Sequence, residues 1–143
     1  MIVINDESIL RAKCSDVLSD EVKSLVATLE KELALSALLG KPGIGLAAPQ
    51  INIHKKAAIV RIDSKYKVDL INARIKKTYD PFIFENEGCL SFPDLLKNTK
   101  RFNEIHVTNN LVYPYSFIAT GLFAIAIQHE LDHLDGKLLI DRK

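Results

Sequence analysis

The sequence predicts an α+β fold, in which one helix precedes and another follows a central region of short strands. Three observations support this: an apolar stripe at helical spacing between residues 19 and 40, β-rich runs between 55 and 118, and a proline-free apolar run from 116 to 134. The length of 143 residues suits one domain with one core. Because neither a repeat nor a Pro/Gly/Ser-rich linker divides the chain, we expect a single domain over residues 1–143.

The composition excludes several classes of function. Hydrophobic residues make up 48% of the chain, charged residues 26%, and the formal net charge is +1. This balance gives no electrostatic footprint for nucleic acid or for an acidic membrane surface. The apolar stretch 121–127 is far too short to span a bilayer. The N-terminal residues do not resemble a secretory signal, and the two cysteines then suit a reducing compartment, so we expect a cytoplasmic protein.

The first helix is expected between Ser19 and Gly40. The acidic residues that follow Ser19 stabilise a first helical turn, and Gly40 suits a helix end. The apolar residues between them share one helical face and are Val22, Leu25, Val26, Leu29 and Leu33. We interpret this face as core packing.

The segment Gly43–Gln50 (GIGLAAPQ) contains two glycines and two alanines, which allow a ligand or another element to approach the backbone closely. It lacks the Gly-Lys-Ser/Thr ending of a phosphate-binding loop. Gln50 is its one strong hydrogen-bonding side chain and can donate to an oxygen that develops negative charge. Taken alone, a tight turn with a surface glutamine is the better interpretation.

Strands are expected at residues 57–62 and 68–71, joined by a turn, and at 104–108. Asn109-Asn110 predicts a hairpin turn that leads through 111–113 directly into the last helix. Asp80-Pro81 predicts a further turn.

The last helix is expected over residues 116–134, with Gly136 as its C-terminal cap. It carries His129, Glu130 and His133 in the pattern His-Glu-x-x-His. Histidines four residues apart lie on one helical face and can bind the same metal ion, while the glutamate can reach a water held by that ion. Upstream, the same stripe contains the apolar residues Leu122, Ile125 and Ala126.

A tetrahedral catalytic site needs a third protein ligand. Only Asp135 and Asp141 follow the motif as carboxylates, which leaves no room for a ligand on a further helix. The candidates therefore lie upstream and are Cys14, Cys89, His54 and His106. Cys14 has no partner pattern and is treated as a bystander.

Cys89 lies in the stretch EGCLSFP, between a glycine and a turn that ends in proline, where a thiol is presented rather than merely packed. A thiolate is a good ligand for zinc or ferrous iron. The main alternative is a cysteine nucleophile with a histidine as base, but that leaves the second histidine and Glu130 without roles. An isolated cysteine can also be a small buried hydrophobe.

Three motifs occur in order: Gly-x-Gly-x-Ala-Ala-x-Gln at 43–50, Glu-Gly-Cys-Leu-Ser at 87–91 and His-Glu-x-x-His at 129–133. In type, order and spacing they resemble the peptide deformylase family, whose members remove the formyl group from N-terminal formyl-methionine. The resemblance implies an α+β fold with antiparallel β-sheets packed around the helix that carries His-Glu-x-x-His, and an N-terminal amphipathic helix.

The resemblance also implies the roles of the motif residues. The metal ligands are Cys89, His129 and His133, and the ion is usually Fe²⁺, which Zn²⁺ or Ni²⁺ can replace. The catalytic residues are Glu130, which carries the proton of a water to the leaving amine, and two donors to the oxyanion, the Gln50 amide and the Leu90 backbone N–H. The substrate-binding residues are Ile44, Gly45, Leu122, Ile125 and Ala126. Formate and a free methionyl amine result.

The implied partners are N-formyl-methionyl nascent peptides and, transiently, the ribosome; we expect a monomer that contacts neither nucleic acid nor membrane directly. Two departures from the family pattern stand out. Leu96 occupies a position where many bacterial members carry arginine, although Arg101 fits a later family arginine. The sequence also lacks the C-terminal helix of many members, which suggests a short form. A non-catalytic binding module on this scaffold is the alternative, but binding metal requires neither Glu130 nor Gln50.

Overall fold

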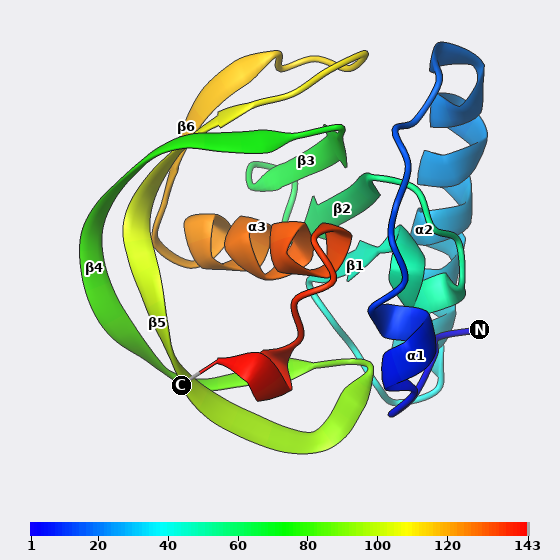
Figure 1. Cartoon of the computed structure of the whole chain (residues 1–143), viewed down its shortest axis with the longest axis horizontal. Helices are drawn as coiled ribbons and strands as arrows, with labels where there is room; N and C mark the ends of the chain where they lie inside the picture. The colour runs from blue at the N-terminus through cyan, green and yellow to red at the C-terminus, as the bar shows by residue number, and fades with distance from the viewer. Residues whose placement is uncertain (143) are drawn as a thin grey trace.

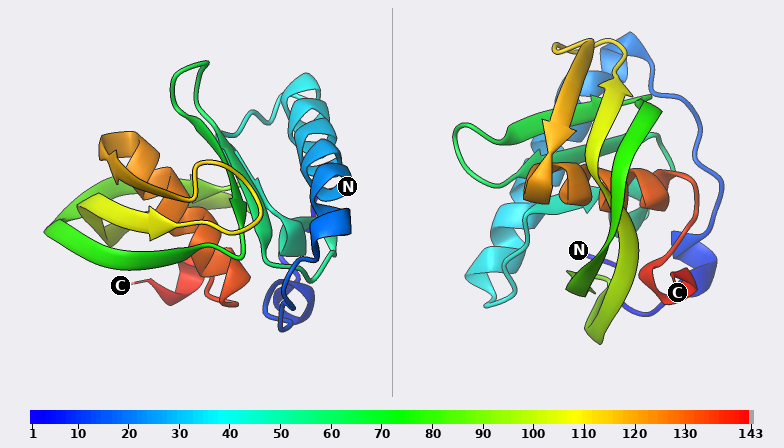
Figure 2. Two further views of the ribbon diagram at one scale, coloured as in Figure 1. Left: turned by 90° about the horizontal axis from the view of Figure 1, so that it is seen from above. Right: turned by 90° about the vertical axis from the view of Figure 1, so that its left-hand side faces the viewer.

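The computed structural model describes residues 1–142 and arranges them in four layers (Figures 1 and 2). Helix α2 covers one face of a sheet, helix α3 covers its other face, and a second sheet curves around the far side of α3. Both sheets are antiparallel, with strand orders β1-β2-β3 and β4-β5-β6. The helix-and-antiparallel-sheet fold expected from the sequence is therefore confirmed.

The helices are α1 (Glu7–Leu10), α2 (Val22–Leu38) and α3 (Gly121–Leu134), with short 3₁₀ turns η1 (Ser19–Glu21), η2 (Ala48–Ile51) and η3 (Leu139–Asp141). The strands are β1 (Gly45–Ala47), β2 (Ala57–Arg61), β3 (Lys67–Ile71), β4 (Arg74–Cys89), β5 (Phe92–Thr108) and β6 (Ser116–Thr120). Among residues 1–142, no helix is long and apolar enough to cross a membrane.

Strand β2 lies between two packed layers because its side chains alternate between the faces of the sheet. Ala57 and Ile59 face α2 and share a core cluster with Leu29, whereas Ala58 and Val60 belong to the cluster built on α3. All four of these strand residues are fully buried. A strand covered on both faces reads as an unbroken apolar run, which is why this one was visible in the sequence.

Helix α3 is shorter than the sequence predicted. Residues 116–120 form strand β6, which pairs with β5 from Glu104–Thr120 to Thr108–Ser116, and the helix begins only at Gly121. The predicted hairpin exists, but residues 111–113 lie in its connecting loop and β6 is the returning strand. The prediction failed because an apolar run of this length suits either a strand or a helix, and pairing with β5 decides for the strand.

The turn predicted at Asp80-Pro81 is also wrong. Both residues lie inside β4, where register pairs Tyr79 with Glu104 and Pro81 with Phe102 on either side of Asp80. Asp80 adopts a positive φ of 57°, which aspartate tolerates better than most residues, so the strand continues. The result is one long hairpin of β4 and β5 that ends at Cys89.

Helix α3 is fixed at both ends of its site-bearing half. The Gln128 side chain donates to the Phe102 carbonyl oxygen at 2.8 Å and accepts from the Phe102 N–H at 3.0 Å, which joins the helix to β5. At the other end, Gly136 has φ 72° and its N–H donates to the His133 carbonyl oxygen at 3.1 Å, as expected of a cap. The histidine turn is thereby held in place.

Candidate metal centre and active site

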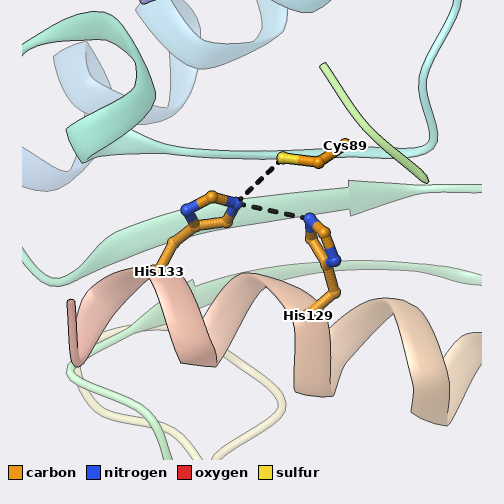
Figure 3. Close-up of side chains that lie close together, drawn as sticks. All are labelled: Cys89, His129 and His133. Carbon is orange, nitrogen blue, oxygen red and sulfur yellow. Dashed lines mark hydrogen bonds between the residues drawn. The ribbon is translucent and has the colours of Figure 1, made fainter. Parts of the chain in front are cut away.

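Three side chains from two distant segments converge at the C-terminal half of α3 (Figure 3). The Nε2 atom of His133 lies 3.3 Å from Nε2 of His129 and 3.4 Å from Sγ of Cys89, which stands at the end of β4. The ligand atoms of all three residues lie within 4.8 Å of one another. The structure thus brings Cys89 to the two histidines.

The other candidates for a third ligand lie elsewhere. The Sγ of Cys14 donates to the Ala12 carbonyl oxygen at 3.9 Å. The ring of His54 pairs with the Ile9 carbonyl oxygen at 2.8 Å, and the ring of His106 pairs with a Glu104 carboxylate oxygen at 3.1 Å. Each of the three therefore has a local partner and no place in the cluster.

The cluster fits a metal ion in both spacing and chemistry. Two imidazole nitrogens bound at about 2.1 Å to one tetrahedral ion lie roughly 3.4 Å apart, and a nitrogen and a sulfur roughly 3.6 Å apart. The separations of 3.3 and 3.4 Å are close to these values. One thiolate and two imidazoles form a donor set that suits zinc or ferrous iron.

The two histidines have opposite electrostatic environments. Burial lowers the pKa of His133 well below its ordinary value, which keeps the ring neutral as a metal ligand must be. Burial also lowers the pKa of His129, but hydrogen bonds with Cys89 and Glu87 outweigh it and raise that pKa well above the ordinary value. The groups around His129 therefore favour a positive charge at this ring.

Glu87 holds the outer side of His129. Its Oε2 lies 2.7 Å from Nδ1 of His129, while Thr99 Oγ1 and Arg101 Nε donate to its Oε1 at 2.7 and 2.8 Å. A carboxylate on one ring nitrogen fixes the tautomer and turns the other nitrogen toward the ligand cluster. Burial raises the pKa of Glu87, but the hydrogen bonds from His129 and Arg101 bring it well below its usual range.

Glu87 has no role that the sequence pattern alone predicts. A signal was present, because residues two apart in a strand point to the same face and Glu87 stands two residues before Cys89. The partner Arg101 was noted only as a family match, since its pairing requires the register of β4 with β5.

Glu130 is buried beside the cluster and packs against Gly45. A Cβ on Gly45 would lie 2.5 Å from Oε2 of Glu130, so only glycine leaves room for the carboxylate. The other oxygen, Oε1, has no hydrogen-bond partner within residues 1–142. Burial raises the pKa of Glu130 to about 7; His129 opposes that shift and Glu87 adds to it. A carboxyl group in this range can both accept and release a proton near neutral pH.

Gln50 is only 2% exposed, so the surface-turn interpretation of this residue is wrong. Its Oε1 accepts from the Ala47 N–H at 2.9 Å, and its Nε2 donates to Ser91 Oγ at 3.1 Å and lies 3.7 Å from Sγ of Cys89. These contacts orient the amide group so that its N–H donors face the cluster. Leu90 follows in the turn between β4 and β5.

A cavity of about 510 Å³ opens beside the cluster. Ile125 and Ala126 form a buried part of its wall, whereas Ile44 and Leu122 are 39% and 48% exposed. Every residue that the sequence assigned to substrate binding lines this cavity: Ile44, Gly45, Leu122, Ile125 and Ala126. Phe84 of β4 also lines it and was missed. A second cavity, of about 540 Å³, borders another face of α3 and holds none of the three clustered side chains.

The model of the family described as Polypeptide deformylase matches residues 1–143. The chain belongs to this family. As a deformylase it is an enzyme of protein biosynthesis that removes the N-formyl group from newly made polypeptides.

Named relatives agree over most of the chain. Peptide deformylase 1 of Pseudomonas syringae pv. tomato is 37% identical over 134 residues, which cover 91% of this chain and 77% of that protein. A peptide deformylase structure from Legionella pneumophila matches with a TM-score of 0.86 at 29% identity, covering 100% of this chain and 85% of the other. A Met-Ala-Ser-bound deformylase structure from Acinetobacter baumannii matches with a TM-score of 0.82 at 28% identity, covering 100% and 97%.

The buried charges behind His129 generate a prediction about stability. Arg101 is 2% exposed and pairs with both Glu87 and Asp132. Arg101→Met should lower the free energy of unfolding by about 3–5 kcal/mol, because it leaves the buried Glu87 carboxylate without its cation. The measurement is urea unfolding followed by circular dichroism.

Arg142→Met is the matched control for that variant. Arg142 also pairs with Asp132, but its side chain is 32% exposed and Arg101 still neutralises the carboxylate in its absence. We expect a loss of about 0–1 kcal/mol. Equal losses in the two variants would contradict the assignment of Arg101 as the buried counter-charge.

Proposed function

We propose that this deformylase hydrolyses N-formyl-methionyl peptides with one divalent ion bound by Cys89, His129 and His133. The ion is Fe²⁺, which Zn²⁺ or Ni²⁺ can replace. The observation that carries the proposal is the convergence of a thiol and two imidazoles beside a buried carboxylate, Glu130, that has an unpartnered oxygen. When bound, such an ion polarises a carbonyl group and lowers the pKa of a water.

The chain's own groups account for the remaining steps. Glu130 accepts a proton from the attacking water at its free oxygen and delivers it to the amine that leaves. The Gln50 side-chain amide and the Leu90 N–H donate to the oxygen of the formyl group as it becomes negative. Formate and a free N-terminal methionine are the products. Gln50 is well suited to this role because Ala47 and Ser91 already fix its orientation.

The apolar cavity is proposed to hold the methionine side chain, between Ile44 at the mouth and Ile125 and Ala126 within. The substrate backbone would extend β1 at Gly45, because this edge strand has only β2 as a neighbour. The Acinetobacter baumannii structure is described as Met-Ala-Ser-bound, and a tripeptide that begins with methionine has the form of the proposed product. Formate release from formyl-Met-Ala-Ser by protein loaded anaerobically with iron tests the proposal.

We further propose that residues 1–143 work as one catalytic domain in a cytoplasmic monomer. Nascent formylated chains are its substrates, contact with the ribosome is transient, and neither nucleic acid nor membrane is bound directly. The net charge of +1 supports the last point, because it provides no large basic surface.

Glu130→Gln separates proton transfer from metal binding. The substitution retains the shape of the side chain, so we expect unchanged metal content, but the amide cannot carry the proton. Turnover of formyl-Met-Ala-Ser should fall about 100- to 10,000-fold. Near-normal turnover in a metal-replete variant would refute the mechanism.

Cys89→Asp and Cys14→Ser together test the third ligand. Cys89→Asp replaces a soft sulfur donor with an oxygen donor and should shift the metal preference away from soft-donor binding, with loss of activity. Cys14→Ser should keep both metal content and rate, since Cys14 lies outside the cluster. Both proteins are prepared without oxygen and analysed for bound metal and formate release.

Formate release also distinguishes the metal enzyme from a cysteine hydrolase. In a cysteine hydrolase, Cys89 would be the nucleophile and His133, 3.4 Å away, would be the base. That enzyme should be indifferent to chelators, whereas the metal enzyme should lose activity on chelation and regain it with added Fe²⁺. Retained activity after complete metal removal would favour the cysteine mechanism.

Ala126→Phe tests the methionine pocket. Ala126 is 4% exposed and lines the cavity, so a phenyl ring there should fill the space for the methionine side chain. We expect kcat/KM for formyl-Met peptides to fall about 10-fold or more. The value for formyl-Gly peptides should change much less, which controls for general damage. An unchanged kcat/KM for formyl-Met peptides would place the pocket elsewhere.

A further inference from the structure

The loop between α2 and β1 holds one lysine at the mouth of the active-site cavity. The backbone of Lys41 is fixed to the end of α2: its N–H donates to the Ser36 carbonyl oxygen at 2.9 Å, and the buried Ser36 Oγ donates to its carbonyl oxygen at 2.6 Å. Two residues later, a Cβ on Gly43 would lie 2.7 Å from the Leu90 side chain, so the loop packs directly on the β4–β5 turn. The backbone of Lys41 therefore has a defined position at the mouth, from which its exposed side chain extends.

The route of a bound peptide follows from the burial of β1. Its residues Leu46 and Ala47 are fully buried, whereas Gly45, Ile44 and Gly43 line the cavity. An extended chain that pairs with β1 and has its N-terminus at the ligand cluster runs along Gly45 toward Gly43, and so toward Lys41. At about 3.3 Å per residue, the second residue after methionine lies roughly 7 Å beyond it, beside this loop.

Lys41 provides the one uncompensated positive charge among the described residues that line this cavity. No other lysine or arginine lines the cavity, and Lys41 has no ion pair within the described part of the chain. Glu87 is neutralised by Arg101, and Glu130 is buried at the inner end. Near the opposite wall, the 66% exposed residue Leu96 pairs with Gly88 and adds no charge.

We infer that Lys41 is a specificity-determining residue that favours peptides with an acidic side chain at the second position after methionine. The inference rests on the proposed function and extends it from the methionine to the following sequence. An exposed ion pair of this kind contributes modestly, so the gain is about two- to five-fold. The ion pair stabilises the bound substrate and the transition state equally, and so it lowers KM while leaving kcat unchanged.

The test compares formyl-Met-Ala-Glu-Ser with formyl-Met-Ala-Gln-Ser, which differ only in that charge. The iron-loaded wild type should show a kcat/KM ratio of about two to five at low salt, falling toward one at about 0.5 M NaCl because the pair is exposed. Lys41→Gln should bring the ratio to about one, and Lys41→Glu should reverse it. Lys23→Gln removes the same charge from the exposed start of α2 and should leave the wild-type ratio unchanged.

A ratio near one in the wild type, or an equal ratio in wild type and Lys41→Gln, overturns the inference; so does its loss in Lys23→Gln. Failure of the proposed function gives a different result, namely no formate from either peptide. In that case fluorescence anisotropy of C-terminally labelled Met-Ala-Glu-Ser and Met-Ala-Gln-Ser still decides the role of Lys41. Tighter binding of the glutamate peptide that Lys41→Gln abolishes supports it, and equal binding overturns it.

Discussion

The site depends on a buried guanidinium group. Arg101 of β5 donates to Glu87 of β4 and to Asp132 of α3, and so joins the curved hairpin to the helix that it surrounds. Glu87 in turn accepts from the ring of His129. Without that cation, the buried Glu87 carboxylate would lose its counter-charge, while Asp132 would keep only Arg142. Leaving a buried charge uncompensated is among the most costly arrangements in a protein. The orientation of the His129 imidazole is therefore tied to the packing of the second sheet on α3.

The small residues of β1 serve the other side of the helix. Gly45 approaches Glu130 so closely that a methyl group would collide with the carboxylate, and Ala47 belongs to the core beneath α3. The contact with Gly45 covers one side of the Glu130 carboxylate, and both residues line the cavity. The same lack of bulk leaves the edge of β1 accessible to an extended peptide. Close packing and the substrate access that we propose thus make the same demand on residues 43–48.

The sequence predicted what is local and missed what depends on pairing. Helical spacing placed His129 and His133 on one face, and the motif with its glycine cap needs only residues near in sequence. The start of α3 and the continuation of β4 through Asp80 depend instead on hydrogen bonds to β5, which local patterns do not contain. The residue pattern alone left four candidates for the third ligand, because Cys89 reaches the histidines only through the long hairpin. Glu87 and Lys41 escaped notice for the same reason.

The two buried glutamates show how one interior supports two kinds of chemistry. Glu87 accepts hydrogen bonds from Arg101, Thr99 and His129, and these hold its pKa well below the usual range, so it stays charged and serves to position the ring. Among residues 1–142, Glu130 has no such donor on its Oε1 oxygen, and burial raises its pKa to about 7. Environments that separate the pKa values of neighbouring carboxyl groups assign them different tasks. Glu87, whose charge is compensated by hydrogen-bond donors, holds the His129 ring in position. Glu130, whose Oε1 oxygen has no such donors in the described part of the chain, is the residue able to move a proton.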